Sequence, residues 1–186
     1  MKRISFLVGA VLLAFSVSVW AQAQAQAPKP DPELQKLGIL VGHWTYEGEY
    51  KPGPLGPGGK ATGDFVFQRI FGGFFFQQQG VEKGAVGETR GVDIYAYDPA
   101  SKNIVYSGYG SDGSAESGTV SFSGNTMTMT GKVSMGGKQI VFRAAMTFAP
   151  DQMSASVKVE FSEEGKTWAP FADYMYTKVK PAPKTK

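Results

Sequence analysis

The chain of 186 residues contains no cysteine and a single histidine, His43. The missing thiols exclude disulfide bridges, cysteine-ligated zinc or iron–sulfur sites and a thiol nucleophile. One histidine also excludes a site built from several histidines. The sequence has no nucleophile elbow, phosphate-binding loop or dinucleotide-binding turn. We therefore expect a protein that is not an enzyme, with no catalytic residues, no metal and no cofactor.

The first 21 residues have the pattern of a cleaved signal peptide. Lys2 and Arg3 precede an apolar run over residues 4–19, and small residues alternate with Gln from Ala21 onward. A retained membrane anchor is the alternative, although the run is slightly shorter than the roughly 18 to 20 residues that cross a bilayer as a helix. We expect a secreted or periplasmic protein whose mature form has no membrane span.

The excess of positive charge lies at the two ends of the chain. In total, 19 Lys and Arg stand against 16 Asp and Glu. Residues 32–179 hold only 13 of these basic residues but 15 of the acidic ones. This central part has no basic stripe interleaved with aromatic residues, and so we expect no nucleic-acid partner.

One folded domain is expected over residues 32–179. Residues 22–31 are rich in Ala, Gln and Pro, and we expect them to form a disordered linker, with a second disordered tail over residues 180–186. Asp31 followed by Pro is typical of a helix start, and Gly38 is expected to end that helix within about two turns. The sequence indicates no other helix in the domain.

From His43 onward the polarity alternates with a period of two, which is typical of strands with one buried and one solvated face. In the first run, Trp44 and Tyr46 share one face while Glu47 and Glu49 share the other. Turn dipeptides containing Gly, Asn, Asp or Pro separate the runs. The pattern predicts ten strands, over residues 43–50, 60–71, 74–82, 88–97, 103–109, 115–123, 126–134, 138–149, 152–162 and 168–179.

Ten strands joined in order by short turns predict an antiparallel meander. Closing the sheet hides its two edges, and so we expect an all-β, up-and-down β-barrel with one short N-terminal helix. Such a barrel has room for side chains or for one small ligand. An outer-membrane barrel also has alternating strands, but charges such as Lys158 and Glu160 would be costly on a face in contact with lipid.

Three motifs carry a resemblance to known families. Leu-Val-Gly-His-Trp-Thr-Tyr-Glu-Gly over residues 40–48 resembles the Gly-x-Trp start of the calycin superfamily, which includes lipocalins, fatty-acid-binding proteins and nitrobindin-like haem barrels. Together with Phe-Gly-Gly-Phe-Phe over 71–75 and Arg-Gly-Val-Asp-Ile-Tyr-Ala-Tyr-Asp over 90–98, it resembles an uncharacterised family of secreted bacterial proteins, classed as a domain of unknown function. The resemblance covers residues 34–179. It implies a calycin-like barrel with a small-ligand role and brings no established activity.

The resemblance also implies roles for individual residues. In lipocalins the Trp of the first strand packs against a basic side chain from the last strand. Trp44 and Lys178 are therefore expected to close one end of the barrel by a cation–π contact. Nitrobindin-like barrels hold haem through a His near their C-terminal strands, whereas no His follows His43 in this chain. Haem binding is therefore not expected.

Two arginines share strand faces with apolar residues. Arg69 continues the face of Phe67, and Arg90 continues that of Val92 and Ile94. A guanidinium inside an apolar lumen needs an anionic partner, which a ligand carboxylate or phosphate would supply. Pairing within the fold, or exposure at a strand end, is the alternative. The candidate ligand-binding residues are Arg69, Arg90, Gln77, Phe67 and Tyr174.

Two functions follow from this fold. The first is binding of a small, largely apolar molecule in the barrel lumen, with the Gly- and Pro-rich segment 53–59 as a lid or a plain connector. The second is a solid-cored barrel that acts through its surface as an envelope structural or interaction protein. Carboxylates such as Asp93 and Asp112 could act as bases, but the sequence does not single them out.

Overall fold

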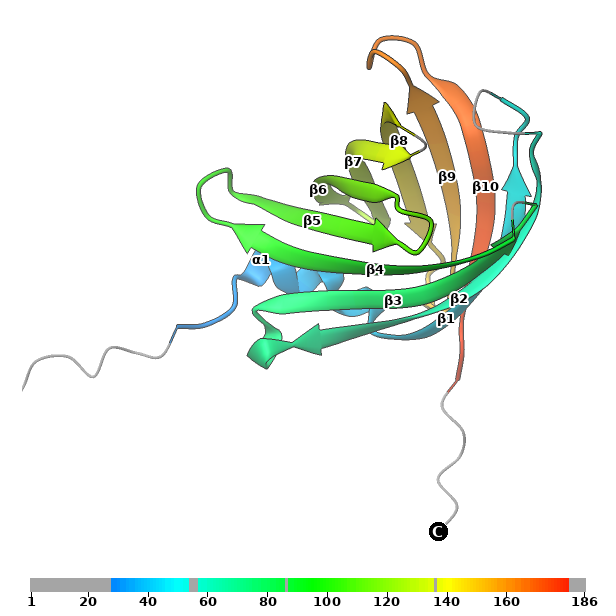
Figure 1. The fold of residues 1–186 in the computed structure, drawn as a ribbon. Coiled ribbons are helices and arrows are strands. Elements are labelled where there is room, and N and C mark those ends of the chain that lie inside the picture. Colours follow the sequence, from blue (N-terminus) through cyan, green and yellow to red (C-terminus); the bar gives the residue numbers. More distant parts are fainter. Residues whose placement is uncertain (1–27, 54–56, 86, 136, 181–186) are drawn as a thin grey trace, which may run out of the picture.

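The computed structural model describes residues 28–180 except 54–56, 86 and 136, and it shows one sheet closed on itself (Figure 1). Ten antiparallel strands follow one another around the barrel in chain order, and pairing of the first with the last closes it. The predicted up-and-down barrel is confirmed. The strands are β1 (Gly42–Tyr50), β2 (Gly59–Ile70), β3 (Phe75–Gly84), β4 (Gly87–Asp98), β5 (Asn103–Gly110), β6 (Ala115–Ser123), β7 (Thr126–Met135), β8 (Lys138–Phe148), β9 (Ser154–Ser162) and β10 (Ala169–Lys178).

Several sequence predictions concern residues outside this range. The predicted signal peptide over residues 1–21 lies outside the described residues, as do residues 22–27 of the predicted linker and 181–186 of the predicted tail. Among the described residues, no helix combines the length and the apolar character needed to span a membrane.

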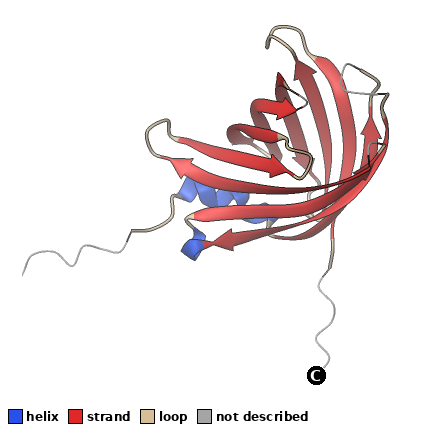
Figure 2. Ribbon diagram, viewed as in Figure 1, coloured by secondary structure: helices blue, strands red, loops and turns tan. Residues whose placement is uncertain are grey.

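One short helical segment covers one end of the barrel (Figure 2). It consists of α1 (Pro32–Gln35) and the 3₁₀ helix η1 (Lys36–Leu40). Asp31 caps α1, because its Oδ1 accepts a hydrogen bond of 2.8 Å from the Glu33 amide. The prediction that Gly38 ends the helix is wrong. The chain continues as η1 because its last turn buries Leu37 and Leu40 in the end of the barrel.

Trp44 and Lys178 lie beneath this helical segment. They are paired in register on β1 and β10, and the Lys178 Nζ lies 5.2 Å from the centre of the Trp44 ring. The Trp44 indole donates a hydrogen bond of 2.7 Å to the Leu40 carbonyl, and Lys178 donates one of 3.0 Å to the Ile39 carbonyl. The two side chains therefore join the first strand, the last strand and the helical segment at the closed end.

The residues predicted to face inward on β1 do so, but on β3 and β4 the opposite set of alternating residues faces inward. The sequence placed Val92 and Ile94 inside, and this is wrong. Tyr95 is the buried residue of β4, and its ring packs at 5.2 Å from Phe67 and 5.4 Å from Tyr106. Aliphatic and aromatic residues alternate on β4, so both of its faces are partly apolar. The face that carries Tyr95 is the inner one, because the Tyr95 ring packs against Phe67 and Tyr106 inside the barrel.

The interior is divided between two kinds of side chain. Aliphatic residues, Met and Phe from β7, β8 and β9 form the buried core together with Trp44, Phe65 and Phe67. Polar side chains enter the interior from β3, β4 and β6, and Gly108 on the intervening strand β5 leaves room for two of them. This division determines the chemistry of the lumen.

Candidate functional site

A cavity of about 360 Å³ lies inside the barrel. This volume is within the range of small-ligand pockets in proteins. Leu40 borders it toward the closed end, and Phe161 and Phe171, stacked at 4.0 Å, border it toward the opposite end. Its apolar wall comes from β7, β8 and β9. The residues of this apolar wall are Met127, Met129, Val133, Met135, Phe142, Ala144, Met146, Val157, Val159 and Phe161.

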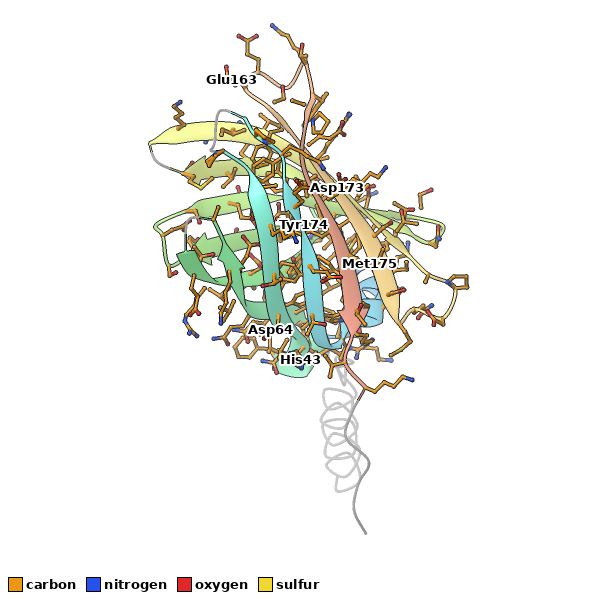
Figure 3. The ribbon with its side chains drawn as sticks, turned by 90° about the vertical axis from the view of Figure 1, so that its right-hand side faces the viewer. His43, Asp64, Glu163, Asp173, Tyr174 and Met175 are labelled. Atoms are coloured by element: carbon orange, nitrogen blue, oxygen red, sulfur yellow. The ribbon has the colours of Figure 1, made fainter. Side chains whose placement is uncertain are left out.

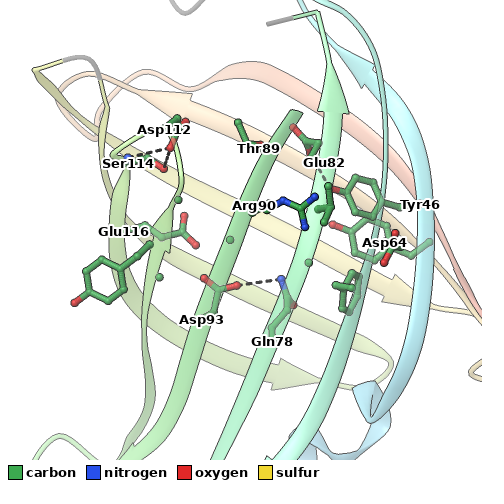
Figure 4. A pocket seen from close by; sticks show the side chains of 18 residues that line it. Tyr46, Asp64, Gln78, Glu82, Thr89, Arg90, Asp93, Asp112, Ser114 and Glu116 are labelled. Carbon is green, nitrogen blue, oxygen red and sulfur yellow. Dashed lines mark hydrogen bonds between the residues drawn. The ribbon is translucent and has the colours of Figure 1, made fainter. Parts of the chain in front are cut away.

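A second part of the lining is polar, and we call it the carboxyl wall. It consists of Gln78 and Glu82 on β3, Asp93 on β4 and Glu116 on β6 (Figure 4). The same four residues also line an adjoining cavity of about 290 Å³. None of the described residues that line the larger cavity is Lys, Arg or His. The lumen therefore combines an apolar wall with a wall of acidic groups.

Asp93 and Glu116 approach each other across a glycine. Gly108 on β5 is paired with Asp93 on one side and with Glu116 on the other. A Cβ atom at Gly108 would lie 2.0 Å from Asp93 Oδ1 and 2.9 Å from Glu116 Cγ. The missing side chain therefore provides the space that the two carboxyl groups occupy.

Burial changes the acidity of both groups. Desolvation raises the pKa of the Asp93 carboxyl to about 6. Desolvation and, to a smaller extent, the neighbouring Asp93 charge raise the pKa of Glu116 to about 7. Asp93 accepts a hydrogen bond of 3.0 Å from the Gln78 amide. Near neutral pH this pair of carboxyl groups therefore titrates between neutral and charged forms.

Glu82 belongs to a tyrosine cluster. Its carboxylate accepts a hydrogen bond of 2.9 Å from the Tyr46 hydroxyl and a second, short one from Tyr50. Burial and the nearby Glu82 charge hold the pKa of both tyrosine hydroxyls well above their usual range. The two tyrosines consequently remain donors, and they satisfy this carboxylate within the protein.

The structure does not bring the two predicted arginines together. Arg69 lies at the closed end, where its Nε is 3.4 Å from Gln35 Oε1 and its guanidinium is 5.3 Å from the centre of the Phe76 ring. Arg90 is exposed and lines the smaller cavity (Figure 4), where its guanidinium pairs with Glu88 at 2.6 Å. Both cations therefore find partners within the fold, which is the alternative that the sequence left open.

The other three predicted residues are divided between three places. Gln77 lies on the outer face, where it accepts a hydrogen bond of 3.0 Å from Gln68; its neighbour Gln78 faces the lumen instead. Phe67 is fully buried in the core and does not line the lumen cavity. Tyr174 does line that cavity, and its ring packs edge-on against Tyr46 at 5.5 Å.

Sequence reasoning missed the carboxyl wall. The relevant signal was present, because Gln78 and Glu82 alternate in phase with Phe76, and Asp93 with Tyr95. The face of β3 and β4 that carries Phe76 and Tyr95 is the inner one, and it also carries the polar residues of the carboxyl wall.

His43 lies on the outer face, as its polar strand face predicts. Its Nε2 is 3.5 Å from Asp64 Oδ1, and Figure 3 shows the two residues together near one end of the barrel. Within the described ranges, no group of three His, Cys, Asp or Glu side chains is placed to hold a metal ion.

The protein is a closed ten-stranded antiparallel barrel of calycin-like form with a cavity of ligand size. Residues 29–178 match a family of proteins of unknown function, DUF1579, and the chain belongs to this family. The family match agrees with the resemblance that the sequence motifs carry. No curated protein matches the chain.

Solved structures are similar to this chain at low sequence identity. The structure of Rv2717c from M. tuberculosis is similar with a TM-score of 0.61 and 15% identity, over 82% of this chain and 100% of that one. The S-type phycobiliprotein lyase CPES from Guillardia theta gives a TM-score of 0.47 at 9% identity, over 81% and 93% of the two chains. A de novo designed fluorescence-activating β-barrel gives a TM-score of 0.42 at 11% identity, over 78% and 98%. The first of these similarities supports the barrel fold.

Proposed function

We propose that this protein binds a small, largely apolar molecule in the lumen of its barrel. The observation that carries the proposal is the cavity of about 360 Å³ with its wall of Met, Val and Phe side chains. Burying an apolar ligand against such a wall is favourable by roughly 25 cal/mol for each Å² removed from water. The closed end, sealed by Leu37, Leu40 and Trp44, directs the ligand to enter from the opposite end.

Ala144 and Ala145 offer a matched test. They are neighbours on β8, but Ala144 lines the cavity while Ala145 is exposed on the outer face. A neutral apolar dye such as N-phenylnaphthylamine should bind the purified protein with increased fluorescence. Ala144→Phe, which fills part of the lumen, should weaken dye binding by tenfold or more, whereas Ala145→Phe should leave it unchanged. Equal binding by both variants, each shown by circular dichroism to be folded, would contradict the proposal.

The proposal is a binding role without catalysis, in a secreted or periplasmic protein. The absence of a nucleophile elbow and of paired histidines supports the first part, and the signal-peptide pattern of residues 1–21 supports the second. Edman sequencing of the N-terminus of the protein recovered from its host tests the location. A start near residue 22 is expected, and an intact N-terminus would contradict it.

A second function, interaction through the surface, is favoured by one feature of the β2–β3 turn. Phe71 is 77% exposed, and Phe74 and Phe75 beside it are also exposed. Exposed aromatic groups of this kind are typical of contact sites. If the barrel acts through this turn, replacing Phe71 and Phe75 by Ser should release the protein from envelope fractions, while dye binding in the lumen remains unaltered.

A further inference from the structure

We propose that the lumen ligand is an amphipathic organic cation, whose charged head lies against Asp93 and Glu116 and whose apolar part lies against the wall from β7–β9. This inference rests on the proposed binding function and specifies the class of its ligand. It differs from the anionic head group that the sequence suggested through Arg69 and Arg90.

The first argument is the unbalanced charge of the lumen. Asp93, Glu116 and Glu82 all line the cavity, and none of its described lining residues is basic. Glu82 is satisfied by two tyrosine hydroxyls, and Asp93 accepts a hydrogen bond from Gln78. No described residue donates a hydrogen bond to Glu116 or forms a salt bridge with it, and Arg90, which lines the smaller cavity, pairs with Glu88 instead. Buried carboxylates need a proton or a positive partner, and a cationic ligand would supply the second.

The second argument is a buried hydroxyl without a partner. Tyr106 is 3% exposed, and its Oη has no hydrogen-bond partner among the described residues. Its ring crosses the inner face of the barrel toward β7, because Tyr106, Gly118 and Gly131 form one cross-strand row and a Cβ at Gly131 would lie 2.9 Å from the hydroxyl. Buried hydroxyls almost always have a partner, and so this one, which lies next to the cavity rather than in its lining, calls for a polar group from outside the chain.

Tyr106 lies one row from the carboxyl pair. Asp93, Gly108 and Glu116 form the adjacent cross-strand row on β4, β5 and β6, and Gly108 follows Tyr106 by two residues on β5. The charges of Glu116 and Asp93 contribute to a pKa of the Tyr106 hydroxyl well above its usual range, with burial as the main cause. A ligand head with several N–H donors would satisfy the carboxyl groups. An acceptor atom of the ligand, or a water molecule bound together with it, would accept a hydrogen bond from the Tyr106 hydroxyl.

The third argument is the aromatic surface next to the carboxyl groups. Phe65 and Tyr176 line both the larger and the smaller cavity, and their rings lie 5.5 Å apart. Tyr95 completes the aromatic lining near Asp93. Aromatic faces attract ammonium groups as well as alkyl chains. A cation can therefore sit between these rings and the carboxyl pair while its apolar part extends to the Met-rich wall.

The ligand should also bind in a pH-dependent way. In the larger cavity Asp93 and Glu116 face Gln78 and Glu82 from β3, Tyr95 from β4 and Tyr176 from β10, and none of these groups is cationic. Toward the smaller cavity they also face Asp64 from β2, Asp112 from the β5–β6 turn and the one cation of that lining, Arg90, whose guanidinium pairs with Glu88. The pair loses its protons as the pH rises through about 6 and 7. A protonated amine should therefore bind more tightly as pH rises over this range, with release of protons to the solution.

Three ligands of the same chain length provide the test: octylamine, octanol and octanoate. Each is titrated against the N-phenylnaphthylamine complex of the purified protein at pH 5.5 and pH 8. Octylamine should displace the dye, about tenfold more tightly at pH 8 than at pH 5.5. Octanol should bind independently of pH, and octanoate should bind the weakest at pH 8.

Substitutions assign the effect to the carboxyl pair. Asp93→Asn and Glu116→Gln should each weaken octylamine binding at pH 8 by about tenfold and leave octanol unchanged. Glu47→Gln removes the same charge from the outer face of β1 and should change neither ligand. Octanoate binding as tightly as octylamine, or carboxyl variants that bind octylamine normally, would overturn the cationic ligand while dye binding still upholds the lumen site. A protein that binds no dye would overturn both proposals.

Discussion

Asp93 on β4 and Glu116 on β6 face each other inside the barrel across a strand that contributes only Gly108 between them. Two carboxyl groups thus occupy the space of one missing side chain, in an interior whose cavity is lined on its other side by Met, Val and Phe. This arrangement links the fold, its pH dependence and the chemistry of the ligand that it can bind.

The free energy of unfolding should fall as the pH rises from about 5 to 8. Burial raises the pKa of Asp93 to about 6 and of Glu116 to about 7, so the folded protein binds these protons more tightly than the unfolded chain. The stability they contribute is present at low pH and is lost as the pH rises through those values. Asp98 and Asp112, whose pKa values are lowered by hydrogen bonds, titrate below this window.

Denaturant unfolding of Asp93→Asn across this pH range measures the effect. The variant should lose much of the pH dependence and gain on the order of 2 kcal/mol relative to the unmodified protein at pH 8. Asp112→Asn, a change of the same kind in the β5–β6 turn, should keep the full slope. A parallel pH profile for Asp93→Asn would show that this carboxyl is not desolvated.

Gly108→Ala should destabilise the protein by about 1–3 kcal/mol, because its Cβ would overlap Asp93 Oδ1. Combining it with Asp93→Ala should recover part of the loss, since the second change removes the overlapping group. Gly91→Ala is a suitable control because a Cβ there meets its nearest neighbour, the Tyr109 carbonyl oxygen, at 3.7 Å. Thermal melts of the unmodified protein, Gly108→Ala, Asp93→Ala, the double variant and the Gly91→Ala control give the comparison, and strictly additive losses in the double variant would contradict the contact.

Lys178→Ala should lower the free energy of unfolding by about 1–2 kcal/mol. The change removes the cation from the Trp44 ring and the hydrogen bond to the Ile39 carbonyl. Urea unfolding followed by tryptophan fluorescence measures this loss. Lys158→Ala on the outer face of β9 should cost less than about 0.5 kcal/mol. Similar effects of both substitutions would show that the closed end does not depend on Lys178.

Phe71→Gly should stabilise the fold by up to about 1 kcal/mol. Phe71 has a φ of 48°, which is unfavourable for a bulky residue, and its exposed ring contacts Phe75 at 6.0 Å between ring centres. Glycine adopts this backbone conformation without strain. The melting temperature of the variant is the readout, with Phe74→Gly as the neighbouring control. A marked loss of stability would mean that the ring packs more firmly than its exposure indicates.

The barrel could be predicted from the sequence because its strands alternate clearly and its turns contain Gly, Asn, Asp and Pro at the right places. In β1, charged Glu47 and Glu49 leave only one possible inner face. On β3 and β4 both faces are partly apolar, so local polarity could not decide between Val92 and Asp93. The choice depends on Tyr95 packing against Phe67 and Tyr106, contacts between strands that the sequence alone does not reveal.

The error of phase on β3 and β4 placed Gln77 and Arg90 in the lumen, whereas Arg69 on β2 keeps the phase of Phe67 but lies at the closed end. Arg69 and Arg90 attracted attention because a cation in an apolar strand face needs a partner. The fold supplies Gln35 and Phe76 to the first, and Glu88 to the second. The acidic character of the lumen becomes visible only when the register of β4, β5 and β6 places Asp93 beside Glu116.

Native mass spectrometry of the protein purified from its own host tests the lumen-binding account most directly. The unmodified protein and the Ala145→Phe variant should each carry a bound small molecule of the same mass, and Ala144→Phe, which fills the cavity, should carry none. A bare polypeptide mass for all three proteins, or the same bound mass on all three, would contradict a ligand in the barrel lumen.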